Sequence, residues 1–312
     1  MPTFASSFCR KGGRPRSPIR RYYQLVSNRA FIPNLDRLVA EFEADPSLVE
    51  PNALRRRITA LDRLDTYFAD SDAAPISEIH ARAFSLRLRL EAANSAVYET
   101  IRSQVRQSAR GEEFLRWFES PKRPPSPGLG YDDLDELMSG VLQLREPAHP
   151  PAHPAAGMVF YQPTPARHIL DLLAATCLSE VDVLVDLGSG LGHVPLMASL
   201  LTEARSIGIE LEPEYVASAR ECARSLGLSR ITFLQQDATD TDFSTGTVFY
   251  LYTPFTGSLL TTVLRKLERE SQNRTFKVCT FGPCTSSLAG ERWLTSTTVP
   301  DTDRITCFCP NT

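Results

Sequence analysis

The second half of the chain alternates between apolar runs and amphipathic segments, and this alternation constrains the fold more than any other feature. After Gly157, a segment with helical periodicity (164–175) precedes an apolar run (181–187), and the same pair of patterns recurs up to residue 281. Such alternation predicts a parallel sheet with right-handed crossovers and helices on both faces. Two later extended stretches, at about 294–299 and 304–309, predict a closing antiparallel hairpin.

The chain before the sheet divides into three parts. Residues 1–33 hold seven basic residues and no acidic one, so we expect a basic, disordered arm; phosphate binding, organelle targeting and an inert tail remain alternatives. Residues 34–119 repeat apolar positions at helical spacing, which predicts a helical accessory domain. Prolines crowd residues 120–156, which predicts a linker with one helix at about 132–144. The expected fold class is therefore α/β: a Rossmann-like doubly wound sheet with a C-terminal antiparallel hairpin (157–312), preceded by a helical N-terminal domain.

Composition narrows the class of protein. With 42% hydrophobic and 23% charged residues and no long uncharged apolar run, the chain is expected to be soluble and cytoplasmic, with no membrane span. Seven cysteines without a C-x-x-C pair predict reduced thiols and no metal site. Cys307 and Cys309 are expected to pack on one face of a strand. The oligomeric state is left open.

A glycine loop joins the first predicted strand to the next helix. The sequence Val185-Asp-Leu-Gly-Ser-Gly-Leu-Gly192 has the strand-turn-helix setting that a nucleotide-binding loop requires. Gly188 and Gly190 allow a sharp turn and the close approach of a ligand, which a Cβ atom would prevent.

The residues around this loop favour S-adenosylmethionine (SAM) over a dinucleotide. A G-x-G-x-x-G fingerprint would place Gly or Ala at His193. Asp186 instead precedes the loop, and a carboxylate repels a pyrophosphate but attracts the ammonium group of a methionine moiety. The loop residues predicted to bind SAM are Asp186, Gly188, Ser189, Gly190 and Gly192.

Two more acidic residues stand at the ends of the second and third predicted strands. Glu210 ends the second predicted strand, about 20 residues after the loop, where an acid can accept both ribose hydroxyls. Asp237 ends the third strand, where it can accept the adenine amino group. Leu211 and Ala238 stand beside these acids and complete the predicted adenosine site. Ligands bind at such carboxyl ends in open α/β sheets.

These motifs resemble the class I SAM-dependent methyltransferases, from about Phe160 to the C-terminus. Within that superfamily the chain is most similar to the disruptor-of-telomeric-silencing type of lysine methyltransferase, through Tyr161-Gln-Pro-Thr164 and D-L-G-S-G-x-G. The resemblance implies that Tyr161 and Thr164 contribute to the cofactor site. The chain departs from that family at the end of the fourth predicted strand, where Tyr252 and Thr253 replace paired Asn residues.

The fourth strand leads into the predicted acceptor site. Its last residues also match half of the Asn/Asp-Pro-Pro-aromatic signature of enzymes that methylate amino groups of nucleic acids. We predict methyl transfer to a macromolecule, with protein lysine as the first candidate and RNA as the second. A small-molecule methyltransferase and a non-catalytic SAM-binding scaffold are the alternatives. The residues predicted to position the acceptor are Tyr252, Thr253, Pro254 and Phe255.

Overall fold

A seven-stranded sheet forms the centre of the computed structural model, which describes residues 35–68, 77–108, 131–147, 159 and 161–311. The strand order is β3-β2-β1-β4-β5-β7-β6. Strands β1 to β5 are parallel, and β7 runs antiparallel to both β5 and β6. The predicted fold class and its closing hairpin are therefore confirmed. The strands are β1 Val183–Leu187, β2 Arg205–Glu210, β3 Ile231–Gln235, β4 Val248–Tyr252, β5 Lys277–Phe281, β6 Leu294–Ser296 and β7 Thr306–Pro310.

Helices cover both faces of the sheet, because successive residues of each strand point to opposite faces. Leu184 packs in the apolar cluster beneath α7, α8 and α9, whereas Val183 and Val185 pack beneath α10 and α11. All five residues of β1 are buried, as expected of a central parallel strand. The sequence did not predict α11. These helices are α7 Ala166–Thr176, α8 His193–Leu201, α9 Pro213–Leu226, α10 Gly257–Ser271 and α11 Cys284–Ala289.

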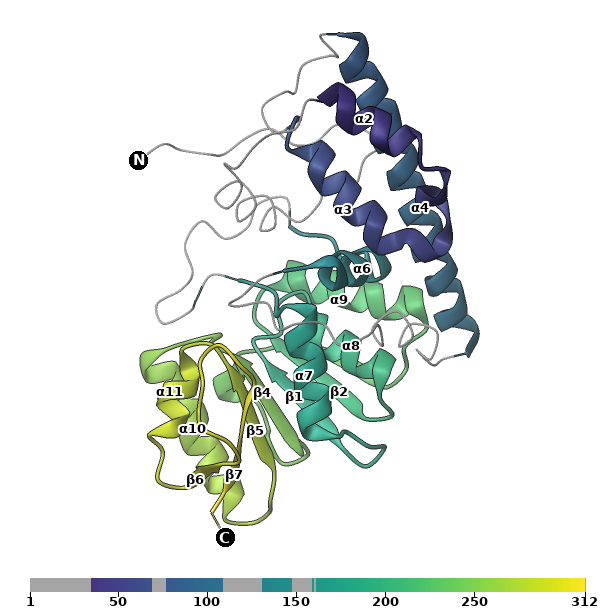
Figure 1. Ribbon diagram of the computed structural model, residues 1–312. Coiled ribbons are helices and arrows are strands. Elements are labelled where there is room, and N and C mark those ends of the chain that lie inside the picture. Colours follow the sequence, from purple (N-terminus) through teal and green to yellow (C-terminus); the bar gives the residue numbers. More distant parts are fainter. Residues whose placement is uncertain (1–34, 69–76, 109–130, 148–158, 160, 312) are drawn as a thin grey trace.

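The N-terminal region is helical (Figure 1), and part of it shares the core of the sheet domain. Helices α2, α3 and the first half of α4 enclose an apolar cluster of their own. Helix α6 and the second half of α4 instead contribute to the cluster beneath α7 to α9. The predicted arm, 1–33, and much of the predicted linker lie outside the described residues. The N-terminal elements are α2 Leu35–Glu43, η1 Pro46–Val49, η2 Pro51–Ala53, α3 Leu54–Asp65, α4 Glu78–Ser108 and α6 Asp133–Leu142.

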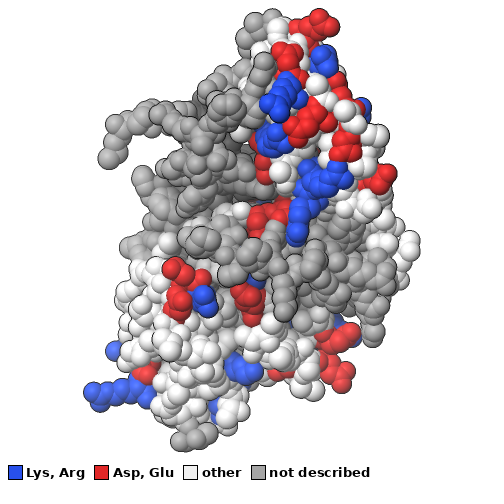
Figure 2. Space-filling view, in the orientation of Figure 1, with Lys and Arg blue, Asp and Glu red and all other residues white. Residues whose placement is uncertain are grey.

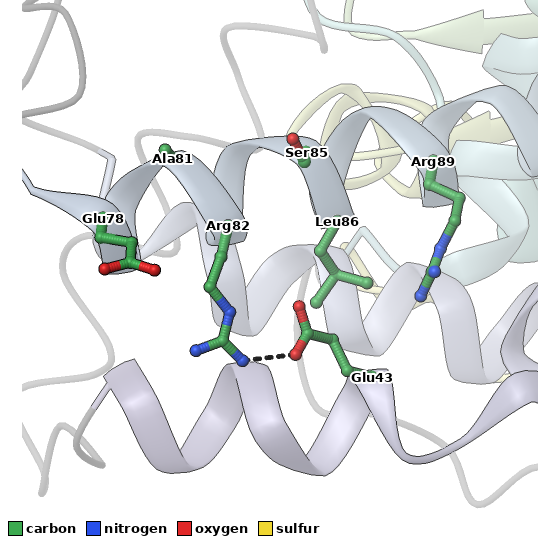
Figure 3. A pocket seen from close by; sticks show the side chains of 7 residues that line it. All are labelled: Glu43, Glu78, Ala81, Arg82, Ser85, Leu86 and Arg89. Carbon is green, nitrogen blue, oxygen red and sulfur yellow. Dashed lines mark hydrogen bonds and ion pairs between the residues drawn. The ribbon is translucent and has the colours of Figure 1, made fainter.

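Charged side chains of both signs crowd the helical region on the face shown in Figure 2. Many of them are paired: Arg63 with Glu41 at 2.9 Å and Arg82 with Glu43 at 2.5 Å. The second pair lies in a surface groove between α2 and α4, which Leu86 and Arg89 also line (Figure 3). In the described part of the chain, no helix is both long and apolar enough to cross a membrane.

One cysteine prediction is wrong. Cys279 on β5 and Cys307 on β7 form a disulfide, although all thiols were expected to be reduced. The two residues are 28 positions apart in sequence, but the antiparallel register places them directly opposite each other, with 4.1 Å between their Cα atoms. Spacing within the sequence does not reveal such a pair, because strand register is a tertiary property. Cys307 is buried, and Cys309 is half-buried.

Candidate active site at the strand ends

The glycine loop turns directly over the end of β2. The amides of Gly188 and Ser189 both donate to the Ile209 carbonyl at 2.9 Å. Gly188 and Gly190 have φ values of +80° and +53°, a region in which a Cβ atom is strained. A Cβ on Gly188 would lie 2.3 Å from the Pro254 side chain. The loop is therefore packed closely against the turn that follows β4.

Glu210 connects the loop to the end of β2. Its carboxylate accepts hydrogen bonds from the backbone amides of Gly190 (2.7 Å), Leu211 (2.8 Å) and Glu212 (2.9 Å). Burial raises the pKa of Glu210, and these amide donors lower it in part. Because an ionised carboxylate offers about four acceptor positions, Glu210 retains acceptor capacity for a ligand.

Asp186 lies at the end of β1 and is 4% exposed. No residue in the described ranges donates a hydrogen bond to its carboxylate. Burial, together with the nearby Glu210 carboxylate, raises the pKa of Asp186 well above its usual value. A buried carboxylate without a donor is costly, so this position is suited to a cationic group.

Asp237 follows the end of β3 and initiates the short helix η3 (Ala238–Asp240). Its Oδ1 atom accepts from the Thr239 amide and the Thr239 hydroxyl, both at 2.7 Å. Because the strand order is β3-β2-β1, Asp237, Glu210 and Asp186 lie at three successive strand ends on one edge of the sheet. Ala238 is half-buried beside Asp237, and Leu211 is exposed beside Glu210.

Residues 161–165, which we call the strap, run over the glycine loop. A Cβ on Gly190 would lie 2.0 Å from the Tyr161 ring. The Tyr161 hydroxyl is 3.0 Å from Nδ1 of His193, and burial lowers the pKa of that imidazole to about 4. His193 is therefore neutral near pH 7 and can accept this hydrogen bond. At the other end of the strap, the Thr164 hydroxyl is 3.0 Å from that of Tyr250.

The turn after β4 brings two of the four predicted acceptor residues to the site. Pro254 packs on the glycine loop, and Tyr252 is half-buried with its ring centroid 4.7 Å from that of Phe281. Thr253 has a φ of +41°, and its hydroxyl donates to the Phe281 carbonyl at 3.2 Å and accepts from the Cys284 amide at 3.0 Å. Phe255 is 4% exposed, within the cluster beneath α10. We therefore propose acceptor contacts for Tyr252 and Pro254, and assign Thr253 and Phe255 structural contacts.

A family model described as a methyltransferase domain matches residues 178–251. This span contains the glycine loop, Glu210, Asp237 and most of β4. The chain contains a class I SAM-dependent methyltransferase domain. No curated protein matches the chain.

Several solved methyltransferase structures are similar to this one. An RNA methyltransferase from Salinibacter ruber, in complex with S-adenosyl-L-homocysteine (SAH), is 28% identical over 47% of this chain and 92% of its own, with a TM-score of 0.40. An rRNA methylase from Streptococcus thermophilus is 12% identical over 49% and 98%, with a TM-score of 0.35. A SAM-dependent methyltransferase from Aquifex aeolicus is 15% identical over 45% and 87%, with a TM-score of 0.35.

The residues of the methyltransferase domain fit SAM, its cofactor. Asp186 would offer a buried carboxylate to the ammonium group, and Glu210 and Oδ2 of Asp237 would offer acceptors to the ribose and the adenine. Bound SAM supplies a methyl group that its sulfonium already activates for transfer. The protein's task is therefore to hold the donor and acceptor in line and to exclude water.

Sequence reasoning missed three residues of this site. His193 and Tyr250 contact the strap through the hydroxyls of Tyr161 and Thr164. His193 follows the glycine loop and Tyr250 lies within an apolar strand, so neither residue matches a motif. His168 is 6% exposed, its ring centroid is 4.2 Å from that of Phe281, and neither ring nitrogen has a hydrogen-bond partner among the described residues. Its Nδ1 atom is 3.6 Å from the Asp171 carboxylate, three residues later on α7. The signal in the sequence that could have revealed His168 was its position as a polar residue on the apolar face of a predicted helix.

We predict that Glu210→Ala weakens SAM binding by about 1–3 kcal/mol, the scale of lost hydrogen bonds to a charged group. The variant should also melt at a lower temperature, because the buried Gly190 amide loses its acceptor. Glu212→Ala is the matched control, since that side chain caps no helix. Calorimetric titration with SAM and a thermal melt provide both values. Unchanged affinity in folded Glu210→Ala would contradict the assignment.

Proposed function

We propose that this chain transfers the SAM methyl group to an amine nitrogen of a macromolecule, with a protein lysine as the first candidate acceptor and RNA as the second. The position of the helical region supports this proposal most directly. Helices α4 and α6 pack toward α9, and α9 packs on β2 and β3 (Figure 1). A lid over a small acceptor would instead have to cover the ends of β4 and β5. The described part of the helical region adjoins the cofactor half of the sheet and does not cover the ends of β4 and β5. The region is therefore suited to binding a large substrate rather than to enclosing a small one.

The side chains at the ends of β4 and β5 support an amine acceptor. Tyr252 presents a half-buried aromatic ring, which packs on the fully buried ring of Phe281, and aromatic faces attract cationic amines. A lysine ammonium must lose a proton before its nitrogen can form a bond to the methyl carbon while the carbon–sulfur bond breaks. The buried imidazole of His168, packed on Phe281, can accept that proton.

The charge pattern favours protein over RNA as the acceptor. RNA recognition requires a stripe of basic groups that neutralises phosphates. The described helical region instead carries charges of both signs, many of them in ion pairs (Figure 2). Interspersed charges of this kind suit a protein surface.

Transfer from methyl-labelled SAM into a cell extract tests the proposal. We expect label in protease-sensitive material, released as methyl-lysine on acid hydrolysis, and no label with an Asp186→Ala variant. Label lost on ribonuclease treatment would make RNA the acceptor and would contradict the lysine assignment. Dialysable label would establish a small-molecule acceptor, and SAM binding without any transfer would establish a scaffold.

A further inference from the structure

The strap that covers the glycine loop is held from outside the sheet domain by helix α6 of the N-terminal region. Its first residue, Tyr161, packs on Gly190, and its fourth, Thr164, bonds to Tyr250. Tyr250 is the register partner of Asp186 on the neighbouring strand. The conformation of the strap therefore determines what lies over the cofactor residues.

Asp135 of α6 accepts a hydrogen bond from the backbone amide that follows the strap. Helix α7 begins after Pro165, which provides no side-chain cap. The Ala166 amide donates instead to Oδ1 of Asp135 at 2.8 Å, in a buried hydrogen bond between two helices. The second oxygen of Asp135 accepts from the Asp132 amide at 2.7 Å, within the capping box of α6. One carboxylate, 8% exposed, thus caps two helices.

Tyr131 holds the middle of the strap. Its hydroxyl donates to the Pro163 carbonyl at 2.7 Å. Pro163 precedes Pro165, the N-cap of α7, so its carbonyl accepts no hydrogen bond within that helix, and the bond from Tyr131 fixes the direction in which the strap approaches α7.

Helix α6 is itself fixed against the cofactor half of the sheet. The Cys222 thiol of α9 donates to the Leu142 carbonyl at 3.1 Å, and the Arg145 amide donates to the Ser218 hydroxyl at 2.8 Å. From α4, the buried Arg102 guanidinium donates to the Val141 carbonyl. Helix α9 directly follows β2, which carries Glu210, so α6 has a defined position relative to the SAM residues.

We infer that Tyr131 and Asp135 are positioning residues for SAM binding: they act through the strap, by holding Tyr161 over Gly190 and Thr164 against Tyr250. The N-terminal helical region therefore completes the cofactor site. This inference rests on the methyltransferase assignment and is independent of the acceptor, so it can be tested with the cofactor product alone.

Calorimetric titration of the full chain with SAH tests the inference. We expect Asp135→Ala to lose SAH affinity at least tenfold and Tyr131→Phe to lose it several-fold. Asp135→Asn keeps an oxygen for the Ala166 amide, so it should recover much of the loss. Asp133→Asn is the matched control: it lies on the same helix, but its carboxylate faces Arg55 at 2.9 Å, and its affinity should equal that of the parent.

Amide hydrogen exchange separates a positioning role from a general loss of stability. In Tyr131→Phe, residues 161–166 should exchange faster, while β1 and β4 keep the parental rates. Parental SAH affinity in Tyr131→Phe, or in folded Asp135→Ala, would overturn the inference. So would an Asp135→Asn variant as weak as Asp135→Ala, or faster exchange throughout the sheet. Tyr131→Phe removes only one hydroxyl, so the test stands even where Asp135→Ala does not fold.

Discussion

Asp186→Asn is expected to stabilise the free protein near neutral pH and to weaken SAM binding by about 3–5 kcal/mol, the scale for breaking a buried charge pair. In the free protein, burial and the Glu210 carboxylate raise the pKa of Asp186. Its ionised form is therefore unfavourable, and stability falls as the pH rises through the folded-state pKa. Asparagine removes this cost. It also removes the buried carboxylate at the end of β1 that can attract an ammonium group.

The same residue makes SAM binding dependent on pH. A cation beside Asp186 lowers its pKa, so binding releases a proton and affinity rises with pH between the bound-state and free-state pKa values. Titrations in two buffers with different ionisation enthalpies should give different apparent binding enthalpies for the parent and equal ones for Asp186→Asn. Equal enthalpies for the parent, or parental affinity in the variant, would show that Asp186 does not face the ammonium group.

Phe255→Ala is expected to lower the free energy of unfolding by about 3–5 kcal/mol, the usual range for truncating a buried phenylalanine. The ring lies in the apolar cluster formed by β1, β4 and α10, so its loss leaves a cavity beneath the turn that carries Pro254. Where the variant remains folded, its SAM affinity should stay within a few-fold of the parental value, because the strand-end acids are intact.

Chemical denaturation of Phe255→Ala and Tyr252→Phe compares two positions on the same turn. Tyr252→Phe keeps the ring against Phe281 and should change stability little, while lowering methyl transfer if its hydroxyl orients the acceptor. An unchanged unfolding free energy in Phe255→Ala, combined with a large loss of transfer, would reverse the two roles and restore Phe255 as an acceptor contact.

The sequence by itself determined the sheet, the loop and the three acids. Each depends on neighbouring residues: the apolar runs around Val185 and Phe249 make buried strands, and Gly188 and Gly190 permit the positive φ values of the turn. Parallel strands carry their carboxyl ends to one edge of the sheet, so acids placed directly after consecutive strands must meet there. Local spacing is sufficient for such features.

The tertiary structure alone decided what surrounds them. Phe255 and Tyr252 are both aromatic and three residues apart, yet one is buried beneath α10 and the other lies at the strand end. The hydrogen bond from the Ala166 amide to Asp135 joins residues 31 positions apart, and the disulfide between Cys279 and Cys307 joins residues 28 apart. These contacts depend on how complete helices and strands pack and align. Packing is a property of the assembled core, so no short stretch of sequence encodes it.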